Sequence, residues 1–261
     1  HDIPFSQPAE KAGNGLGAQG QPSAFNRQPL ICPPMPCYRL DSELWFPPVE
    51  LADDSGLLAV GGDLSAERLL LAYSMGIFPW YNPGEPILWW SPDPRCVLYP
   101  DAVHLSRSLK RSLNKNHYRI SFNENFAAVI YWCRRLRAGL DGSGTWITPE
   151  MRSAYLRLHE LGFAHSVECW EDDQLVGGLY GVCIGRCFFG ESMFRRRDNA
   201  SKIVLVHLMR RLQQQNFVLL DCQQTTAHLL SMGAREISRT AFLDHLKEAN
   251  LPPNGPLRSM F

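Results

Sequence analysis

The stretch Ala164–Glu191, AHSVECWEDDQLVGGLYGVCIGRCFFGE, decides the fold. It holds three runs of strand-forming residues, at 164–171, 174–184 and 186–191, which are separated by Asp172-Asp173 and by Gly185. Asp and Gly between apolar runs are typical of tight turns, so the stretch predicts three consecutive antiparallel strands.

Helices and strands alternate on both sides of these three strands. On the N-terminal side, the spacing predicts a basic helix over 106–115, a strand over 118–122, a helix from Asn123 to 137 and a helix starting at Thr148-Pro149-Glu150. On the C-terminal side it predicts a helix over 199–215, a strand over 217–222, a helix over 225–232, a strand over 234–237 and a helix over 238–248. We expect an α+β protein with a mixed sheet. The order resembles the GNAT acyltransferase fold, in which two central strands splay apart around an acyl-binding cleft.

Composition divides the chain into three parts. Residues 1–36 contain seven prolines and four glycines, which predicts a flexible arm. Residues 37–100 are rich in aromatic residues, Pro and Gly, and hold one clear helix over 65–74 with Ser65 as its N-cap and Gly76 after its end. We expect a small N-terminal α/β domain over 37–100 and a GNAT-like acyltransferase domain over 101–261.

The composition is that of an ordinary globular protein. Of 261 residues, 45% are hydrophobic and 20% are charged, which excludes collagen-like, coiled-coil and wholly disordered chains. No apolar run approaches the ~18–20 residues of a membrane-spanning helix. The eight cysteines form no C-x2-C pair, so we expect reduced thiols in a cytosolic protein and no metal site.

The formal net charge of zero hides two regions of opposite sign. Residues 37–100 carry three basic and nine acidic side chains, whereas residues 101–137 carry eight basic and two acidic ones. The stretch 102–119 has five bases and no acid: Arg107, Lys110, Arg111, Lys115 and Arg119. Such a block suits a phosphate backbone, and it equally suits a solvated helix face.

Several short strings together resemble one family, the leucyl/phenylalanyl-tRNA–protein transferases, from about residue 40 to about residue 251. They are Gly61-Gly62-Asp63-Leu64, Gly76-Ile77-Phe78-Pro79-Trp80, Leu88-Trp89-Trp90-Ser91-Pro92-Asp93-Pro94-Arg95, Gly144-Thr145-Trp146-Ile147-Thr148, His159-Glu160-Leu161-Gly162, Gly190-Glu191-Ser192-Met193-Phe194, Asn199-Ala200-Ser201-Lys202 and Asp221-Cys222-Gln223.

The resemblance implies an activity. Such enzymes transfer Leu or Phe, and less well Met, from charged tRNA to the α-amine of proteins that begin with Arg or Lys, which marks those proteins for degradation by the N-degron pathway. The aminoacyl ester is already activated, so neither a cofactor nor a covalent enzyme intermediate is required. We expect a cytoplasmic monomer whose partners are Leu-tRNA, Phe-tRNA and protein N-termini, with no membrane attachment.

The same resemblance implies a catalytic group of Asp221, Gln223 and Glu191. Residues two apart on a strand face the same way, so Asp221 and Gln223 can reach one cleft. Asp221 is expected to hold the Gln223 amide so that its oxygen faces the incoming amine. Glu191 ends an apolar run, and we expect it to bind an ammonium or a ribose hydroxyl. A strand-end Asp–Gln pair, and an ion pair of Glu191 with Arg195 or Lys202, are the structural alternatives.

Further site residues follow from the family. Trp80 and Trp146 match residues that stack on the terminal adenosine of tRNA, although a tryptophan is also an ordinary core residue. An apolar slot that accepts Leu, Phe and Met but rejects β-branched residues is implied around five positions. These are Leu179, Phe188, Met193, Leu208 and Leu220.

The segment Phe194–Lys202, which reads FRRRDNASK, contains no glycine. GNAT enzymes that use acetyl-CoA carry glycines at this place, where backbone N–H groups bind the pyrophosphate. We therefore favour a charged-tRNA substrate. The alternatives are a divergent acyl-CoA N-acetyltransferase and a non-catalytic RNA-binding module.

Overall fold

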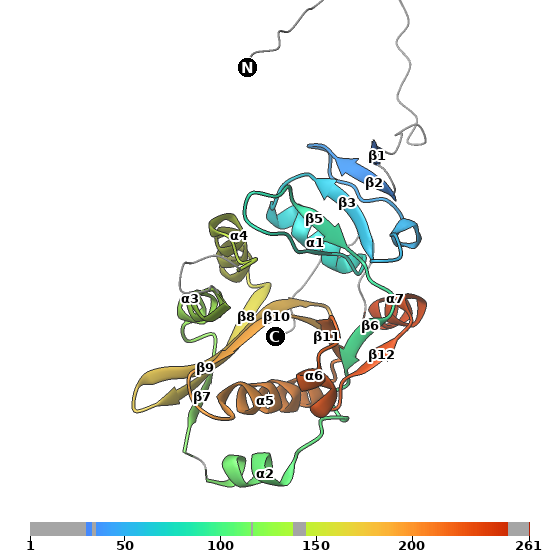
Figure 1. Cartoon of the computed structure of the whole chain (residues 1–261). Helices are drawn as coiled ribbons and strands as arrows, with labels where there is room; N and C mark the ends of the chain where they lie inside the picture. The colour runs from blue at the N-terminus through green and yellow to red at the C-terminus, as the bar shows by residue number, and fades with distance from the viewer. Residues whose placement is uncertain (1–29, 33–34, 116, 138–144, 250–260) are drawn as a thin grey trace, which may run out of the picture.

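In a computed structural model, the chain folds around two β-sheets that share an apolar core, and a second apolar core belongs to the larger sheet (Figure 1). The structure describes residues 30–32, 35–115, 117–137, 145–249 and 261. The fold is α+β, as predicted, and within the described residues no helix is both long and apolar enough to cross a bilayer. Most of the predicted arm of residues 1–36 lies outside the described residues.

The smaller sheet has the strand order β1-β2-β3-β5-β4 and carries helix α1. Its strands are β1 (Leu30–Cys32), β2 (Met35–Leu40), β3 (Leu57–Gly61), β4 (Phe78–Pro79) and β5 (Leu88–Trp90), with a 3-10 turn at Val49–Leu51 and α1 at Ala66–Ser74. The predicted cap is confirmed, because the Ser65 side chain accepts a hydrogen bond from the Arg68 backbone N–H.

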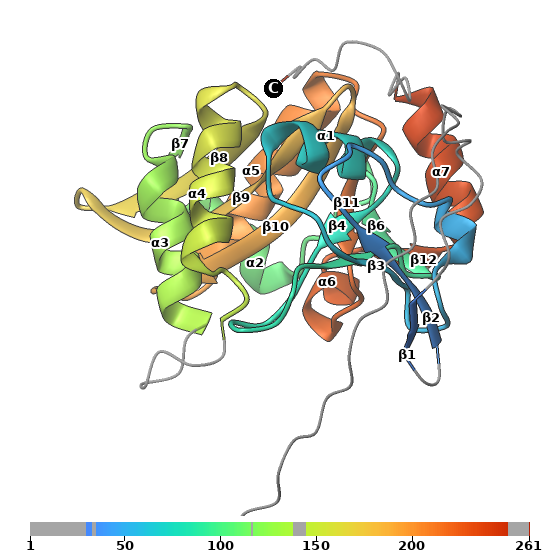
Figure 2. The same ribbon diagram turned by 90° about the horizontal axis from the view of Figure 1, so that it is seen from above.

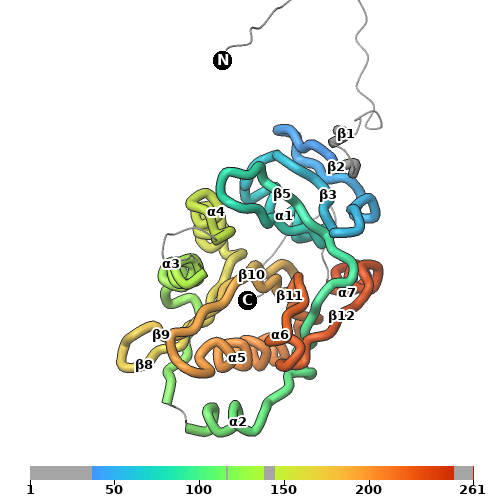
Figure 3. Tube along the Cα trace, in the orientation of Figure 1, coloured from blue at the N-terminus to red at the C-terminus, as the bar shows by residue number. Residues whose placement is uncertain are grey.

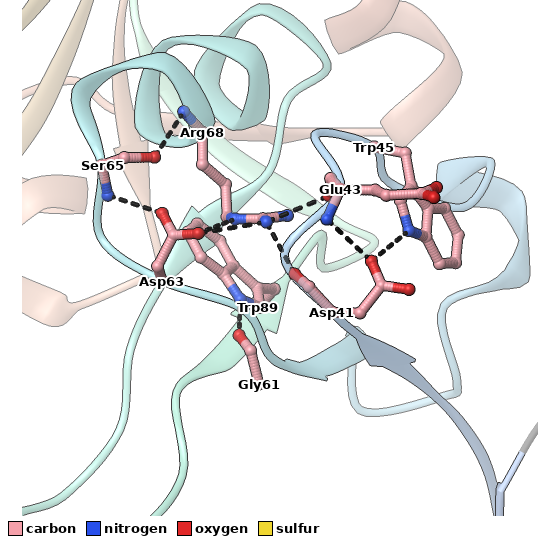
Figure 4. A network of polar contacts seen from close by, with 8 residues as sticks. All are labelled: Asp41, Glu43, Trp45, Gly61, Asp63, Ser65, Arg68 and Trp89. Atoms are coloured by element: carbon pink, nitrogen blue, oxygen red, sulfur yellow. Dashed lines mark hydrogen bonds and ion pairs between the residues drawn. The ribbon is translucent and has the colours of Figure 1, made fainter.

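One buried arginine holds the turns of this smaller sheet together (Figure 4). Arg68 is 1% exposed, and its Nη2 donates to the carbonyl oxygens of Asp41 and Glu43 at 2.8 and 3.0 Å. The same guanidinium pairs with Asp63 at 3.2 Å. These bonds fix the loop that carries Gly61-Gly62-Asp63, and Trp89 Nε1 donates to the Gly61 carbonyl oxygen beside it.

The larger sheet has the order β12-β6-β11-β10-β9-β8-β7. Its strands are β6 (Arg95–Leu98), β7 (Arg119–Phe122), β8 (Ala164–Glu171), β9 (Gln174–Ile184), β10 (Cys187–Arg195), β11 (Leu219–Gln223) and β12 (Arg235–Ile237). The predicted meander is confirmed, since β8, β9 and β10 pair antiparallel in sequence. β10 runs four residues beyond the predicted end at Glu191, because β9 continues to pair with it up to Arg195.

Helices cover both faces of this sheet. α3 (Phe126–Arg137) and α4 (Pro149–Glu160) pack on one face, and α5 (Ala200–Gln214) packs on the other with α2 (Arg107–Asn114) outside it (Figures 1 and 2). The last helices are α6 (Ala227–Ser231) and α7 (Arg239–Glu248). Helix starts predicted at Ser106, Thr148 and Ser238 are confirmed by side-chain caps.

Two local predictions differ from the structure. Asn123 does not cap α3: its φ is 59°, and its side chain accepts from the Ser166 backbone N–H, so it ends β7 instead. The cap lies two residues later, where Asn125 Oδ1 accepts from Ala128 N at 3.0 Å. β6, although within 37–100, pairs with β11 and β12 in the larger sheet. The change of sheet therefore falls between Trp90 and Arg95.

β10 and β11 are the parallel pair of the larger sheet, and they splay apart. Only three residues of each strand pair, Cys187–Phe189 with Leu219–Asp221. Beyond Phe189, β10 follows β9 while β11 bends toward β6 (Figure 3). The predicted splayed, mixed sheet is confirmed, and the opening between these strands positions the site.

Candidate active site

A pocket of about 350 Å³ lies where β10 and β11 diverge. Its walls come from β4, β9, β10, α5, β11 and α6, from the end of α3, and from the loops after β4, before α4 and after β11. Part of the wall is apolar, formed by Leu179, Met193, Leu205, Leu208, Leu220 and Leu229. Another part is polar, formed mainly by Glu191, Asp221 and Gln223. The sequence-predicted catalytic group therefore shares one hollow with four of the five predicted apolar residues.

Phe188 is the predicted apolar residue that does not line the pocket. Its side chain is fully buried, and a Cβ added to Gly181 would lie 2.4 Å from its Cε1, so the ring packs over that glycine in the core. The prediction missed Leu205, which lies one helical turn before Leu208 on α5. That i, i+3 spacing is a signal that could have found it.

Backbone irregularities place the polar residues at the pocket. In β10 the register with β9 shifts between Gly190 and Ser192, which makes Glu191 the extra residue of a β-bulge. In β11 the register with β6 shifts between Asp221 and Gln223, and Gln223 has a φ of 62°. A bulge redirects a side chain that regular alternation would place elsewhere. Both strand ends therefore present polar groups at the splay.

Asp221 is fully buried and is paired with a cation. Arg95 on β6 donates Nε and Nη2 to its two carboxylate oxygens at 2.9 and 2.7 Å. The guanidinium lies between the rings of Phe78 and Phe242, at 4.7 and 4.6 Å from their centroids. It also donates to the Gly76 carbonyl oxygen at 3.1 Å. This two-pronged geometry offsets the cost of burying both charges.

The expected contact between Asp221 and the Gln223 amide is wrong in its detail. Asp221 Oδ1 accepts from the backbone N–H of Gln223 at 2.9 Å, not from its side chain. The side-chain Nε2 of Gln223 instead donates to Glu191 Oε1 at 2.8 Å. Because the left-handed backbone of Gln223 turns its side chain away from Asp221, two-residue alternation does not hold here. The side-chain amide of Gln223 is therefore held through its nitrogen by Glu191, and the backbone of Gln223 is held by Asp221.

Glu191 is 8% exposed and is hydrogen-bonded to phenol hydroxyls from two helices. Tyr73 Oη on α1 lies 2.8 Å from Oε1, and Tyr155 Oη on α4 lies 2.7 Å from Oε2. Burial raises the pKa of Glu191 to about 7, although the bonds from both phenols and from Gln223 oppose that shift. Neither Arg195 nor Lys202 pairs with it among the described ion pairs. Sequence reasoning missed both tyrosines and Arg95.

The two predicted tryptophans meet at the pocket from different parts of the chain. Trp80 follows β4 in the smaller sheet, and Trp146 precedes α4. Trp80 is 39% exposed, and its ring meets Trp90 edge to face at 5.9 Å. An exposed indole at the rim of a pocket can stack on a planar ligand.

The basic stretch divides between two elements. Arg107, Lys110, Arg111 and Lys115 lie on or directly after α2 with exposed side chains. Arg119 lies on β7 and is paired with Glu124 at 2.9 Å. In the segment before α5, Arg196 packs on the ring of Trp132 at 4.2 Å and Arg197 donates to Glu171 at 2.8 Å. These three arginines therefore already have protein partners.

The splayed sheet thus surrounds an apolar pocket with polar strand ends, and comparisons of sequence give the class of protein. The family model described as "Leucyl/phenylalanyl-tRNA protein transferase" matches residues 97–247, and the model of that family's N-terminal domain matches residues 62–93. The chain belongs to the leucyl/phenylalanyl-tRNA–protein transferase family.

Relatives named leucyl/phenylalanyl-tRNA–protein transferase align over most of their length. The protein of Syntrophobacter fumaroxidans is 61% identical over 218 residues, covering 84% of this chain and 92% of its own. That of Syntrophotalea carbinolica is 55% identical, covering 86% of this chain and all of its own. Among solved structures, an aminoglycoside acetyltransferase aligns over 56% of this chain and 95% of its own, at 12% identity and a TM-score of 0.34.

Proposed function

We propose that this protein transfers Leu or Phe, and less efficiently Met, from aminoacyl-tRNA to the N-terminal α-amine of cytoplasmic proteins that begin with Arg or Lys. The product would carry an N-terminal residue that marks it for N-degron degradation. The observation that carries the proposal is the pocket itself, which joins an apolar cavity to oriented polar groups at one opening. Family membership supports the same conclusion.

The apolar part of the pocket suits the side chain of the transferred residue. Leu179 and Leu208 are 3% and 0% exposed, so they form a fixed wall, whereas Met193 is only partly buried. A rigid apolar slot rejects a misplaced methyl group by about 1–3 kcal/mol, which is enough to disfavour β-branched residues. Trp80 and Trp146 would stack on the terminal adenosine, a contact of about 1–3 kcal/mol per base.

The polar part suits the aminolysis of an ester. The amine nitrogen attacks the ester carbonyl, the C–N bond forms, the C–O bond to the ribose breaks, and one proton passes from nitrogen to the departing ribose oxygen. The Gln223 amide nitrogen is committed to Glu191, which leaves its carbonyl oxygen to accept from the amine. In this proposal Asp221 is a positioning residue, because it holds the backbone of Gln223 and not the substrate.

The exposed bases of α2 would contact the tRNA backbone. Arg107, Lys110, Arg111 and Lys115 form no ion pair among the described residues, so their charges are free to meet phosphate groups. Arg119 is the weakest member of the predicted set, because Glu124 already neutralises it.

The experiment mixes the protein with tRNA charged with labelled Leu and with peptides that begin with Arg, Lys or Glu. We expect label on the Arg and Lys peptides, and none on the Glu peptide or on an Arg peptide whose α-amine is acetylated. Labelled acetyl-CoA in a parallel reaction should yield no acetyl-peptide. Acetyl transfer, or equal leucylation of all free N-termini, would contradict the proposal.

A further inference from the structure

Three oxygen–oxygen contacts of hydrogen-bond length form a closed ring at Glu191. Tyr73 Oη lies 2.7 Å from Tyr155 Oη, Tyr73 Oη lies 2.8 Å from Glu191 Oε1, and Tyr155 Oη lies 2.7 Å from Glu191 Oε2. Each such contact holds one proton between its two oxygens. The two phenols supply only two protons. A ring of three hydrogen bonds therefore requires a third proton.

The third proton belongs to the carboxyl group. Burial raises the pKa of both Tyr73 and Tyr155 well above 10, so each phenol keeps a single proton and neither can supply a second. The Gln223 amide makes a separate contact with Oε1 and does not enter the ring. A carboxylate would leave one pair of oxygens facing each other at 2.7 or 2.8 Å with no proton between them.

The neighbours of the carboxyl group determine which oxygen carries the proton. Oε1 accepts from Gln223 Nε2 at 2.8 Å and lies 2.8 Å from Tyr73, which is the pattern of a carbonyl oxygen with two lone pairs. Oε2 has Tyr155 as its partner. The ring then runs in one direction, from Oε2–H to Tyr155, from Tyr155 to Tyr73, and from Tyr73 to Oε1.

Charged groups around Glu191 do not offer an alternative to a proton. Arg137 on α3 lines the pocket but donates its Nε to Ser192 Oγ at 3.0 Å, and Asp221 on β11 is itself neutralised by Arg95. The other titratable neighbours are uncharged: Tyr73 on α1, Tyr155 on α4, and Tyr180 on β9 beside Cys133 on α3. Among the described residues no ion pair includes Glu191, and a buried acid without a cation is more stable when neutral.

We propose that Glu191 of the free protein takes up a proton on Oε2 and becomes a neutral carboxylic acid that closes the ring, and that Tyr155 and Tyr73 are the positioning residues that orient it. The catalytic meaning of this state rests on the proposed function. A neutral acid beside Gln223 leaves the attacking amine without an anion that would favour its unreactive ammonium form. The protonation itself is a property of the free protein and does not depend on the identity of the substrate.

The test is an NMR titration of the free protein labelled with 13C at the glutamate Cδ. We expect one resonance to titrate with a midpoint of about 7, while ordinary glutamates titrate near ~4.3, and we expect Glu191→Gln to remove that resonance. If every glutamate Cδ titrates below about pH 5, the proposal is overturned. No tRNA is present, so a failure of leucyl transfer would leave this result intact, and the reverse also holds.

Two variants test the ring. In the neutral ring Tyr155 accepts from Oε2–H, whereas in the ionised form it donates to the carboxylate, which is the stronger hydrogen bond. Tyr155→Phe therefore weakens the ionised form more than the neutral one, so the midpoint should rise. Tyr180→Phe is the matched control, because Tyr180 is equally buried in the same wall and its hydroxyl has no hydrogen-bond partner among the described residues. The control should leave the midpoint unchanged. Equal shifts in both variants would show that Tyr155 does not bond the Glu191 carboxyl group, which would overturn the ring.

Discussion

Two buried carboxyl groups face the same pocket, one at the end of β11 and one at the bulge of β10, and their surroundings differ. Asp221 meets a guanidinium that contacts two aromatic rings and bonds both of its carboxylate oxygens. Glu191 meets two phenols and an amide, and no cation. Burial alone therefore does not decide the charge of a group. The partner that the fold brings to it does.

The largest effect is expected from breaking the buried ion pair between Arg95 and Asp221. Arg95→Met should lower the free energy of unfolding by about 3–5 kcal/mol, because it leaves Asp221 buried without its cation. Urea unfolding at pH 7 measures this change. Arg119→Met breaks an exposed ion pair and serves as the control, with a much smaller expected effect. Similar losses in both variants would mean that the buried pair does not stabilise the fold.

The protonation of Glu191 should change how the free energy of unfolding depends on pH. The pKa of Glu191 is raised in the folded state from 4.5 to about 7, so the folded protein binds more protons than the unfolded chain in this window. Stability should fall as pH rises from about 4.5 to about 7. Because Glu191→Gln keeps the neutral shape and cannot ionise, it should exceed the wild type by about 3 kcal/mol at pH 8.

The measurement is urea unfolding of both proteins between pH 4.5 and 8. Contributions of other groups cancel in the difference between them. A difference that stays flat across this range would show that Glu191 ionises equally in the folded and the unfolded states.

Gln223 is hydrogen-bonded to both Asp221 and Glu191, and removing its side chain should affect leucyl transfer far more than stability. Gln223→Ala keeps the hydrogen bond from the backbone N–H to Asp221, but it removes the hydrogen bond from the side-chain amide to Glu191. We expect the single-turnover rate of leucyl transfer to fall at least about 10-fold and the unfolding free energy to change by about 1 kcal/mol. Gln214→Ala, on the exposed side of α5, is the control. An unchanged rate would remove Gln223 from the proposed site.

The smallest effect on stability is expected from removing exposed basic side chains of α2. Replacing Arg107, Lys110 and Arg111 with Ala should leave stability and the titration of Glu191 unchanged, because these side chains are exposed on α2. tRNA affinity should become less dependent on salt, with the log–log slope falling by about 0.7–0.9 per lost phosphate contact. An unchanged slope would assign the block to a solvated helix face.

Local chemistry explains which features the sequence could predict. A capping serine or threonine bonds a backbone N–H three residues away, so Ser65, Ser106 and Thr148 could be recognised directly. The order of elements, together with the resemblance to a family, also predicted the splayed sheet and the residues at its opening.

Long-range partners could not be predicted in this way. Arg95 lies 126 positions before Asp221, and Tyr73 lies 118 before Glu191, so no spacing rule connects them. The expected contact between Asp221 and the Gln223 amide failed for a local reason. It assumed regular strand alternation, whereas the register of β11 with β6 shifts between Asp221 and Gln223, and Gln223 has a φ of 62°. The prediction for Phe188 came from the family resemblance alone.

Neutron diffraction from deuterium-exchanged crystals at pH 6 tests the difference between the two carboxyl groups most directly. We predict a deuteron on Oε2 of Glu191 and none on either oxygen of Asp221, with deuterons between Tyr155 and Tyr73 and between Tyr73 and Oε1. Two bare carboxylates, or a deuteron on Asp221 and none on Glu191, would contradict this account.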